Sequence, residues 1–211
     1  GWPVVIQAGG SDETIEMASR IADVLFTAQA DFDSARDFYH RVKTAVCARG
    51  RPADSIRVMP GLSVFVAPTR EEAEDKFDAL HDMVDVKDAV EGLSRLLGGV
   101  DLSDFDPEAP MPALEGNDLR KSGPGTFVRI GRENNYTLGQ VAVQAKAARN
   151  HCLVIGTVEE VADHMENWFL NGAADGFNLL PAIVPGTLTD FCNLVVPELQ
   201  SRGLFRSEYE G

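Results

Sequence analysis

The chain has 211 residues, of which 44% are hydrophobic and 25% charged, and its formal net charge is -14. This length and composition are typical of a globular protein with one large or two small domains and a substantial core. The strong negative charge argues against binding to nucleic acids or to anionic membrane surfaces, because both need clustered Lys and Arg.

No apolar run approaches the roughly 20 residues that a membrane-spanning helix needs. The sequence also lacks a basic segment followed by an apolar one, so no signal peptide is predicted. The three cysteines are widely spaced and form no CxxC pair, which favours free thiols in a reducing compartment. We therefore expect a cytoplasmic protein without a membrane partner.

The first predicted element is a buried strand over residues 3–8, which runs directly into Gly9, Gly10 and Ser11. A strand that ends in glycines and opens a helix can bind an anion, because free backbone N–H groups and the positive helix end point the same way. Gly9, Gly10 and Ser11 are therefore candidate phosphate-binding residues. The alternative is an ordinary turn in which Ser11 only caps the helix. The apolar face of that helix is expected on Ile15, Ala18, Ile21, Ala22 and Leu25.

A second strand is predicted over residues 23–28, and Asp31 or Asp33 can cap the helix that follows it. The apolar positions of this second helix are Ala35, Phe38, Tyr39, Val42, Val46 and Cys47. A third strand over residues 55–67 is expected to be bent or broken at Pro60-Gly61, since proline in a strand usually marks an edge or a bulge.

Thr69 and Glu72 have the spacing of a capping box, which predicts a third helix. The order so far is strand and helix in alternation with short connections, which is typical of a parallel α/β fold. The pattern then fails from about residue 98 to 135. We interpret residues 101–135, rich in proline and glycine, as an inserted excursion or lid; a surface loop without a role is the alternative.

Regular patterns return in the last third of the chain. They predict a helix over residues 137–148, a strand over 152–156, a helix capped by Thr157, a final buried strand over 176–181 and a last helix from about 187. The strand–helix unit thus recurs about four times, which corresponds to half of an eight-stranded (β/α)₈ barrel. The chain begins without an initiator Met directly at a strand, which we interpret as a fragment of a larger domain.

Residues with catalytic potential are scattered. The four histidines, His40, His81, His151 and His164, stand apart, and no His/Cys/carboxylate cluster has the spacing of a metal site, so no metal is expected. No nucleophile elbow, Walker loop or dinucleotide fingerprint is present, so the motifs identify no catalytic residue. Asn178 can serve a ligand or satisfy backbone groups next to the last strand.

Six segments together resemble a known family, although each alone is weak. The segments are residues 3–9, 23–27, 59–62, 155–157, 175–179 and 196–206. Their combination is similar to the C-terminal half of the bacterial-luciferase-like flavin monooxygenases, in the branch of the nitrilotriacetate, dibenzothiophene-sulfone and long-chain-alkane monooxygenases.

This resemblance implies a TIM-type barrel that binds reduced FMN supplied by a separate flavin reductase and uses O₂ to oxygenate a small organic or xenobiotic compound. It places the FMN phosphate at Gly9, Gly10 and Ser11, although the branch commonly has a serine where this chain has Gly10. The excursion at 101–135 is expected to cover the active site. We also expect a homo-oligomer, and no oxygenase activity from the 211 residues alone. The alternative is a non-catalytic half-barrel or flavin- or phosphate-binding module that needs a partner chain.

Overall fold

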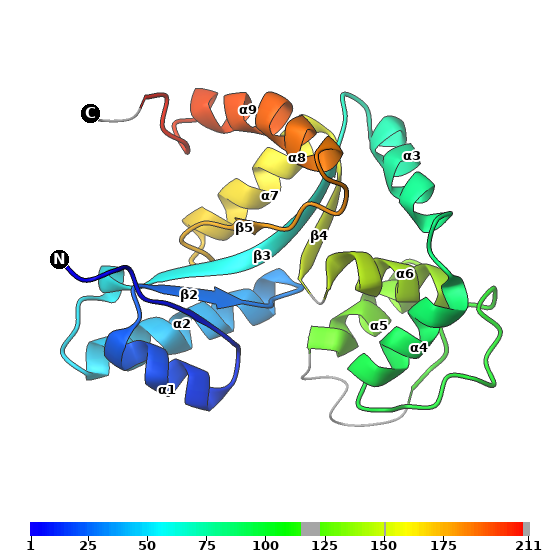
Figure 1. Ribbon diagram of the computed structural model, residues 1–211, viewed down its shortest axis with the longest axis horizontal. Coiled ribbons are helices and arrows are strands. Elements are labelled where there is room, and N and C mark those ends of the chain that lie inside the picture. Colours follow the sequence, from blue (N-terminus) through cyan, green and yellow to red (C-terminus); the bar gives the residue numbers. More distant parts are fainter. Residues whose placement is uncertain (115–122, 150, 209–211) are drawn as a thin grey trace.

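The computed structural model describes residues 1–114, 123–149 and 151–208 and contains a five-stranded sheet flanked by helices (Figure 1). All strand pairs are parallel, which confirms the α/β class predicted from the alternation of strands and helices. The strands are β1 (Ile6–Ala8), β2 (Val24–Thr27), β3 (Arg57–Val66), β4 (Cys152–Gly156) and β5 (Asn178–Leu179).

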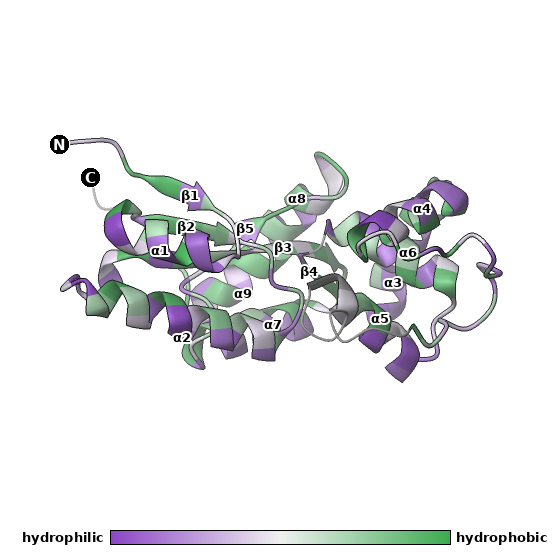
Figure 2. Ribbon diagram, turned by 90° about the horizontal axis from the view of Figure 1, so that it is seen from below, coloured by the Kyte–Doolittle hydropathy of each residue, from purple (hydrophilic) through white to green (hydrophobic). Residues whose placement is uncertain are grey.

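The helices account for most of the remaining described residues. Those that flank the sheet are amphipathic, with hydrophobic and hydrophilic bands on the same helix (Figure 2). They are α1 (Asp12–Ile21), α2 (Phe32–Ala48), η1 (Ala53–Ser55), α3 (Arg70–His81), α4 (Val86–Leu96), α5 (Gly123–Glu133), α6 (Leu138–Ala148), α7 (Val158–Leu170), α8 (Gly186–Asp190), the π-helical η3 (Phe191–Val195) and α9 (Val196–Ser201). None of the helices in the described part of the chain is long and apolar enough to cross a membrane.

The long strand β3 organises the sheet. Its first four residues pair with β2 and its last five with β4, while β5 pairs with β3 at Gly61 and Leu62. The expected break at Pro60-Gly61 is wrong, because β3 continues through both residues. Pro60 is the last residue opposite β2 and Leu62 the first opposite β4, so the residue without an N–H stands where one partner strand gives way to the next.

Strand β1 was expected to be buried, and this prediction is wrong. Val4 and Ile6 are 67% and 65% exposed, and Trp2 is 87% exposed. The reason is position: β1 pairs with β2 alone, so within the described residues it forms an edge of the sheet. Ile21 of α1 is also exposed, contrary to its expected place on the apolar face, and so is Cys47 of α2.

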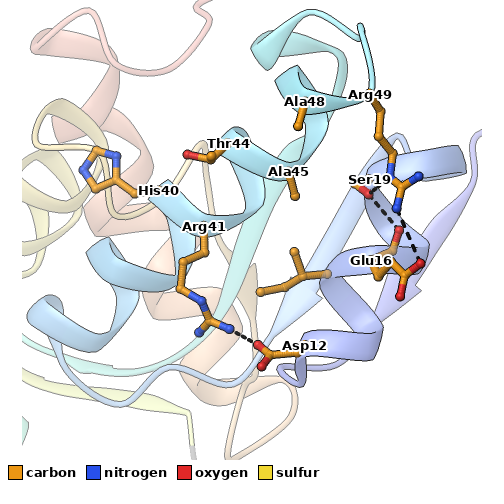
Figure 3. A pocket seen from close by; sticks show the side chains of 10 residues that line it. Asp12, Glu16, Ser19, His40, Arg41, Thr44, Ala45, Ala48 and Arg49 are labelled. Carbon is orange, nitrogen blue, oxygen red and sulfur yellow. Dashed lines mark hydrogen bonds and ion pairs between the residues drawn. The ribbon is translucent and has the colours of Figure 1, made fainter.

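Helices α1 and α2 pack side by side (Figure 3), α1 against β1 and α2 against β3. Ser11 caps α1 and Asp31, not Asp33, caps α2. Most of the predicted apolar positions of both helices are buried together with Leu25 of β2; this set comprises Ile15, Ala18, Ala22, Phe38, Val42 and Val46, and Ala35 is buried in the neighbouring cluster. On the outer side, Arg41 pairs with Asp12 and Arg49 with Glu16 across the gap between the helices.

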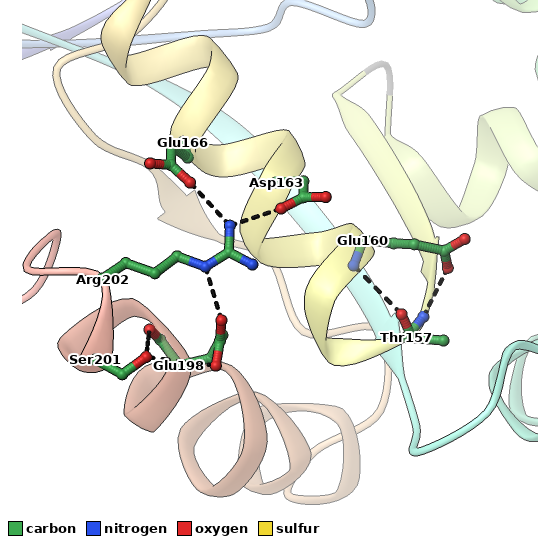
Figure 4. A network of polar contacts seen from close by, with 7 residues as sticks. All are labelled: Thr157, Glu160, Asp163, Glu166, Glu198, Ser201 and Arg202. Carbon is green, nitrogen blue, oxygen red and sulfur yellow. Dashed lines mark hydrogen bonds and ion pairs between the residues drawn. The ribbon is translucent and has the colours of Figure 1, made fainter.

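The C-terminal helices α7 and α9 are held together by Arg202 (Figure 4). Its guanidinium donates to Glu198 at 2.7 Å, Asp163 at 2.6 Å and Glu166 at 2.8 Å. These three carboxylates raise the pKa of Arg202 further above its ordinary value, chiefly through the hydrogen bonds that they accept. The ion-pair network therefore fixes the last helix on α7, whose Trp168 lies in the core beneath it.

The chain between β3 and β4 contains three helices besides α3, and one of them lies within the excursion 101–135 among the described residues. Helices α4, α5 and α6 lie together beside the sheet (Figure 1) and share a core with Phe65 of β3. Helix α5 falls inside the segment 101–135 that was expected to be irregular; residues 115–122 of that segment lie outside the described residues. Gly131 is one reason why the sequence does not show this helix. Glycine is required there because a Cβ would stand 2.2 Å from Val141 and would separate α5 from α6.

Candidate functional site

The glycine turn, residues 9–11, lies between the end of β1 and the start of α1. The Gly9 N–H donates to the Phe26 carbonyl at 3.0 Å, which ties the turn to β2. Gly9 has φ of 147°, and a Cβ at this position would stand only 2.5 Å from Thr14 Oγ1. Only glycine is therefore compatible with this conformation at position 9. The tight turn places the start of α1 at the carboxyl end of β1.

Ser11 is the N-cap of α1. Its Oγ accepts a hydrogen bond from the Thr14 N–H at 3.2 Å, as the structural alternative for this residue predicted. A hydroxyl that accepts from a backbone N–H keeps its own proton for a further acceptor. Thr14 Oγ1 lies 3.2 Å from Ser11 Oγ, so these two hydroxyls can share one hydrogen bond. Hydrogen bonding from the Glu13 backbone N–H and from Ser11 holds the pKa of the Glu13 carboxyl below its ordinary value. A carboxylate thus already lies where an anion would bind.

Gly10 opens onto a hollow of about 670 Å³ at the carboxyl ends of β1 and β2. A Cβ on Gly10 would lie 3.7 Å from Thr27 Oγ1, an ordinary contact, and Thr27 in turn accepts a hydrogen bond from Gln29 Nε2 at 3.0 Å. Thr27 and Gln29 therefore belong to the candidate site, although the sequence analysis did not single them out. The available signal was their place at the end of a strand and just after it, where parallel sheets carry their ligands.

The charges around this hollow are mostly negative. Its lining residues include Asp31, Asp33 and Asp37, and Arg41 is the one basic side chain among them. Arg41 is paired with Asp12 (Figure 3) and lies 3.8 Å from Asp37. A phosphate bound here would therefore gain from the backbone and from Arg41, and would be opposed by the surrounding carboxylates.

Asp31 connects the hollow to the excursion. Its carboxylate accepts hydrogen bonds from the Ser34 N–H and hydroxyl, and from Thr126 Oγ1 of α5 at 3.0 Å. Burial works to raise the pKa of Asp31, but these hydrogen bonds and the nearby Arg129 hold it below its ordinary value. The charged form of Asp31 is thus the one that fastens α5 beside the carboxyl end of β2.

The polar residues before β5 are structural. The side chain of Asp175 is 10% exposed, and its carboxylate accepts from Lys43 Nζ at 2.8 Å, the Val58 N–H at 2.7 Å and Tyr39 Oη at 3.1 Å. Burial and the Asp175 charge raise the pKa of Tyr39 to about 12. Asn178 donates to the Met59 carbonyl at 3.5 Å, which favours the structural alternative for this residue.

Cys152 and His164 form a contact that resembles a nucleophile–base pair, with 3.4 Å between Cys152 Sγ and His164 Nε2. Burial raises the pKa of the Cys152 thiol to about 12, and desolvation lowers the pKa of His164 to about 4. Both groups are therefore uncharged at neutral pH, whereas a reactive pair needs a thiolate beside an imidazolium. This pair is a packing contact.

Thiol reactivity should follow this assignment. In the native chain at pH 7.5, iodoacetamide is expected to modify the exposed Cys47 and Cys192 and to leave Cys152 unmodified, because Cys152 is 4% exposed and its pKa is high. Intact-mass spectrometry checks the count, and labelling in urea is the control that should modify all three. Native modification of Cys152 at the rate of Cys47 contradicts the assignment.

His164 should also make stability depend on pH. Its folded pKa lies below the unfolded value of 6.5, so the unfolded chain binds the extra proton first and stability falls as the pH falls from about 6.5 to 4. We expect a loss of up to about 3 kcal/mol from this residue over that range. Urea unfolding of the wild type and of His164→Leu at each pH measures this loss. The free energy of unfolding of the wild type minus that of the variant should fall as the pH falls from about 6.5 to 4, and a constant difference contradicts the prediction.

Among the residues that the structure describes, no group of three or more His, Cys, Asp or Glu side chains could hold a metal ion. His40 lies on α2 and lines the outer groove between α1 and α2 (Figure 3). His151 lies beside the candidate site, where it stacks on Phe26 of β2.

Comparisons with known proteins agree with this architecture. The family model described as luciferase-like monooxygenase matches residues 1–175. Nitrilotriacetate monooxygenase component A of Aminobacter aminovorans is 39% identical over the whole chain, which covers 47% of that protein. N-acetyl-S-(2-succino)cysteine monooxygenase of Bacillus subtilis is 37% identical, again over the whole chain and 48% of that protein. The chain thus spans about half the length of the curated relatives that it matches.

Solved structures give the same result. The crystal structure of DmoA from Hyphomicrobium sulfonivorans has a TM-score of 0.83 at 28% identity, over 99% of this chain and 44% of the other. A riboflavin lyase crystallised with modified FMN and riboflavin has a TM-score of 0.73 at 32% identity, over 99% of this chain and 45% of the other. The expected TIM-barrel type of fold and the resemblance to the nitrilotriacetate and dibenzothiophene-sulfone branch are thereby confirmed.

Proposed function

Because the chain belongs to the luciferase-like monooxygenase family, we propose that it forms part of a reduced-FMN-dependent monooxygenase that oxygenates a small organic compound with O₂. The relatives named as monooxygenases and the neighbouring structure with modified FMN support this proposal. The name component A of one relative supports a two-component system, in which a separate flavin reductase supplies the reduced FMN. Bound FMN supplies the redox chemistry, and the protein binds, orients and shields it.

The glycine turn carries this proposal. Its backbone fits an anion, since Gly9 makes the tight turn, Gly10 leaves open space beside Thr27, and the first N–H groups of α1 have no partner within the helix. We assign the FMN phosphate to Gly9, Gly10 and Ser11. The Ser11 hydroxyl would donate a hydrogen bond to a phosphate oxygen. Among the described residues that line the hollow, Arg41 is the one with a positive side chain.

The excursion is proposed to exclude water from the site. The hydrogen bond from Thr126 of α5 to Asp31 places the excursion beside the carboxyl end of β2, where the hollow opens. Residues 101–135 would then act as a cover over the flavin and the substrate. A covered site strengthens polar contacts to the bound groups and protects them from solvent.

We further propose that residues 1–211 form the C-terminal half of a (β/α)₈ barrel. The half-length match to the relatives and the exposed edge of β1, with Trp2, Val4 and Ile6 on it, support this assignment. The remaining barrel strands would pack on that edge, from the same polypeptide or from another copy in a homo-oligomer. The 211 residues alone should show no substrate turnover with added flavin reductase, and robust turnover contradicts the half-barrel assignment.

The phosphate assignment is tested by charge. Ser11→Asp puts a carboxylate at the proposed phosphate position, and we expect it to weaken binding of reduced FMN at least tenfold, measured by anaerobic fluorescence titration. Ser207→Asp, on an exposed position near the C-terminus, carries the same charge change and should bind like the wild type. Equal affinity of the Ser11→Asp variant and the wild type removes the turn from the site.

A further inference from the structure

His151 occupies a niche between β2 and β3. Its ring lies parallel to Phe26, with the ring centroids 5.1 Å apart and an interplanar angle of 12°. On the other side, a Cβ built on Gly61 would stand 2.3 Å from His151 Nδ1 and 2.7 Å from Cγ. The imidazole thus fills the space that any larger residue at position 61 would take.

The polar atoms of this ring have unequal surroundings. Nδ1 is buried and has no hydrogen-bond partner among the described residues. Burial lowers the pKa of His151, a hydrogen bond with the Thr27 backbone works in the opposite direction, and the Arg149 charge lowers the pKa further. The ring is therefore neutral at physiological pH. It can act through its flat shape and through its hydrogen bond with the Thr27 backbone.

One of the residues that His151 contacts on β2 holds the glycine turn. The Phe26 carbonyl accepts the hydrogen bond from the Gly9 N–H at 3.0 Å. A displacement of the end of β2 would thus reach Gly9 through this hydrogen bond.

We propose that His151 is a positioning residue for the phosphate-binding turn: packed between Phe26 and Gly61, it fixes the end of β2 and, through the hydrogen bond to Phe26, Gly9. The inference rests on the proposed function for the identity of the ligand, but the mechanical link stands on the contacts of the chain itself. His151 precedes β4 directly, so it also couples the start of β4 to the turn.

Amide hydrogen exchange of the free chain tests the link without any ligand. His151→Ala removes the ring, and we expect exchange of the Gly9 N–H to become at least tenfold faster, with the fold checked by circular dichroism. His151→Phe keeps a flat ring on Phe26 and should stay within threefold of the wild type. His40→Ala, on the outer face of α2, is the matched control and should leave Gly9 unchanged.

Two results overturn the proposal: unchanged Gly9 exchange in a folded His151→Ala chain, or equal acceleration in the Ala and Phe variants, which would assign the effect to the ring nitrogens. If His151→Ala does not fold, His151→Leu fills the niche without a flat ring and should still accelerate Gly9 exchange at least threefold. The same variants titrated with FMN connect the two proposals. Failure of the wild type to bind FMN counts against the proposed function alone, because the exchange data still decide the role of His151.

Discussion

Replacing Gly9 with alanine is expected to lower the free energy of unfolding by about 1–3 kcal/mol and to weaken FMN binding at least tenfold. A Cβ at this position meets Thr14 Oγ1 at 2.5 Å, and φ of 147° is one that other residues rarely adopt. The turn can relieve both problems only by moving, which disturbs the hydrogen bond from Gly9 to Phe26 and the start of α1. Urea unfolding and fluorescence titration measure the two effects.

Gly10→Ala is the matched control for this prediction. It adds the same methyl group one residue along the chain, where the nearest atom is 3.7 Å away and the backbone is unstrained. We expect its stability to stay within about 0.5 kcal/mol of the wild type. Equal losses of unfolding free energy in the Gly9→Ala and Gly10→Ala variants show that the geometry assigned to this turn is wrong.

Removing the carboxylate of Asp175 should have the largest effect on stability, about 3–5 kcal/mol for Asp175→Ala. The side chains of Asp175 and Lys43 are only 10% and 12% exposed, so the change leaves a buried ammonium whose remaining partners are the Ala53 and Ile56 carbonyls. It also removes an acceptor from the Val58 N–H at the start of β3. The packing of α2 against the start of β3 should therefore loosen, and urea unfolding detects this loss of stability.

The control for Asp175 is a surface pair. Asp33 is 82% exposed and contacts Arg36 at 3.0 Å, and Asp33→Asn should change stability by less than about 0.5 kcal/mol. A double variant, Lys43→Met with Asp175→Leu, removes both buried charges and should recover part of the loss. A small effect of Asp175→Ala, comparable with that of Asp33→Asn, contradicts the structural role assigned to the buried pair.

Much of the fold could be predicted from local signals. The capping boxes at Thr69 and Thr157 and the apolar period of α2 are properties of a few adjacent residues, and the structure contains each of them. The burial of β1 could not be predicted, since its apolar residues are the same whether β1 lies inside a barrel or at an edge. Helix α5 was concealed because its glycines weaken a helical pattern, and Gly131 has its reason in the neighbouring α6.

Some residues of the candidate site could likewise be predicted from the sequence and others could not. Gly9, Gly10 and Ser11 are visible in the sequence because the turn is contiguous and glycine-rich. Thr27 and His151 are 124 positions apart, and only the pairing of β4 along β3 brings the histidine to the end of β2. Two residues that contact through tertiary structure leave no periodic or spacing signal in a single sequence.

Amide chemical-shift mapping of the 211-residue chain decides whether residues 9–11 bind the phosphate of FMN. Spectra are recorded with FMN and with riboflavin, which lacks the phosphate, so that weak binding is also detected. We predict that FMN shifts the amide signals of Gly10, Ser11 and Asp12 and that riboflavin leaves these three unchanged. Shifts of equal size with both ligands, or FMN shifts confined to other parts of the chain, contradict it.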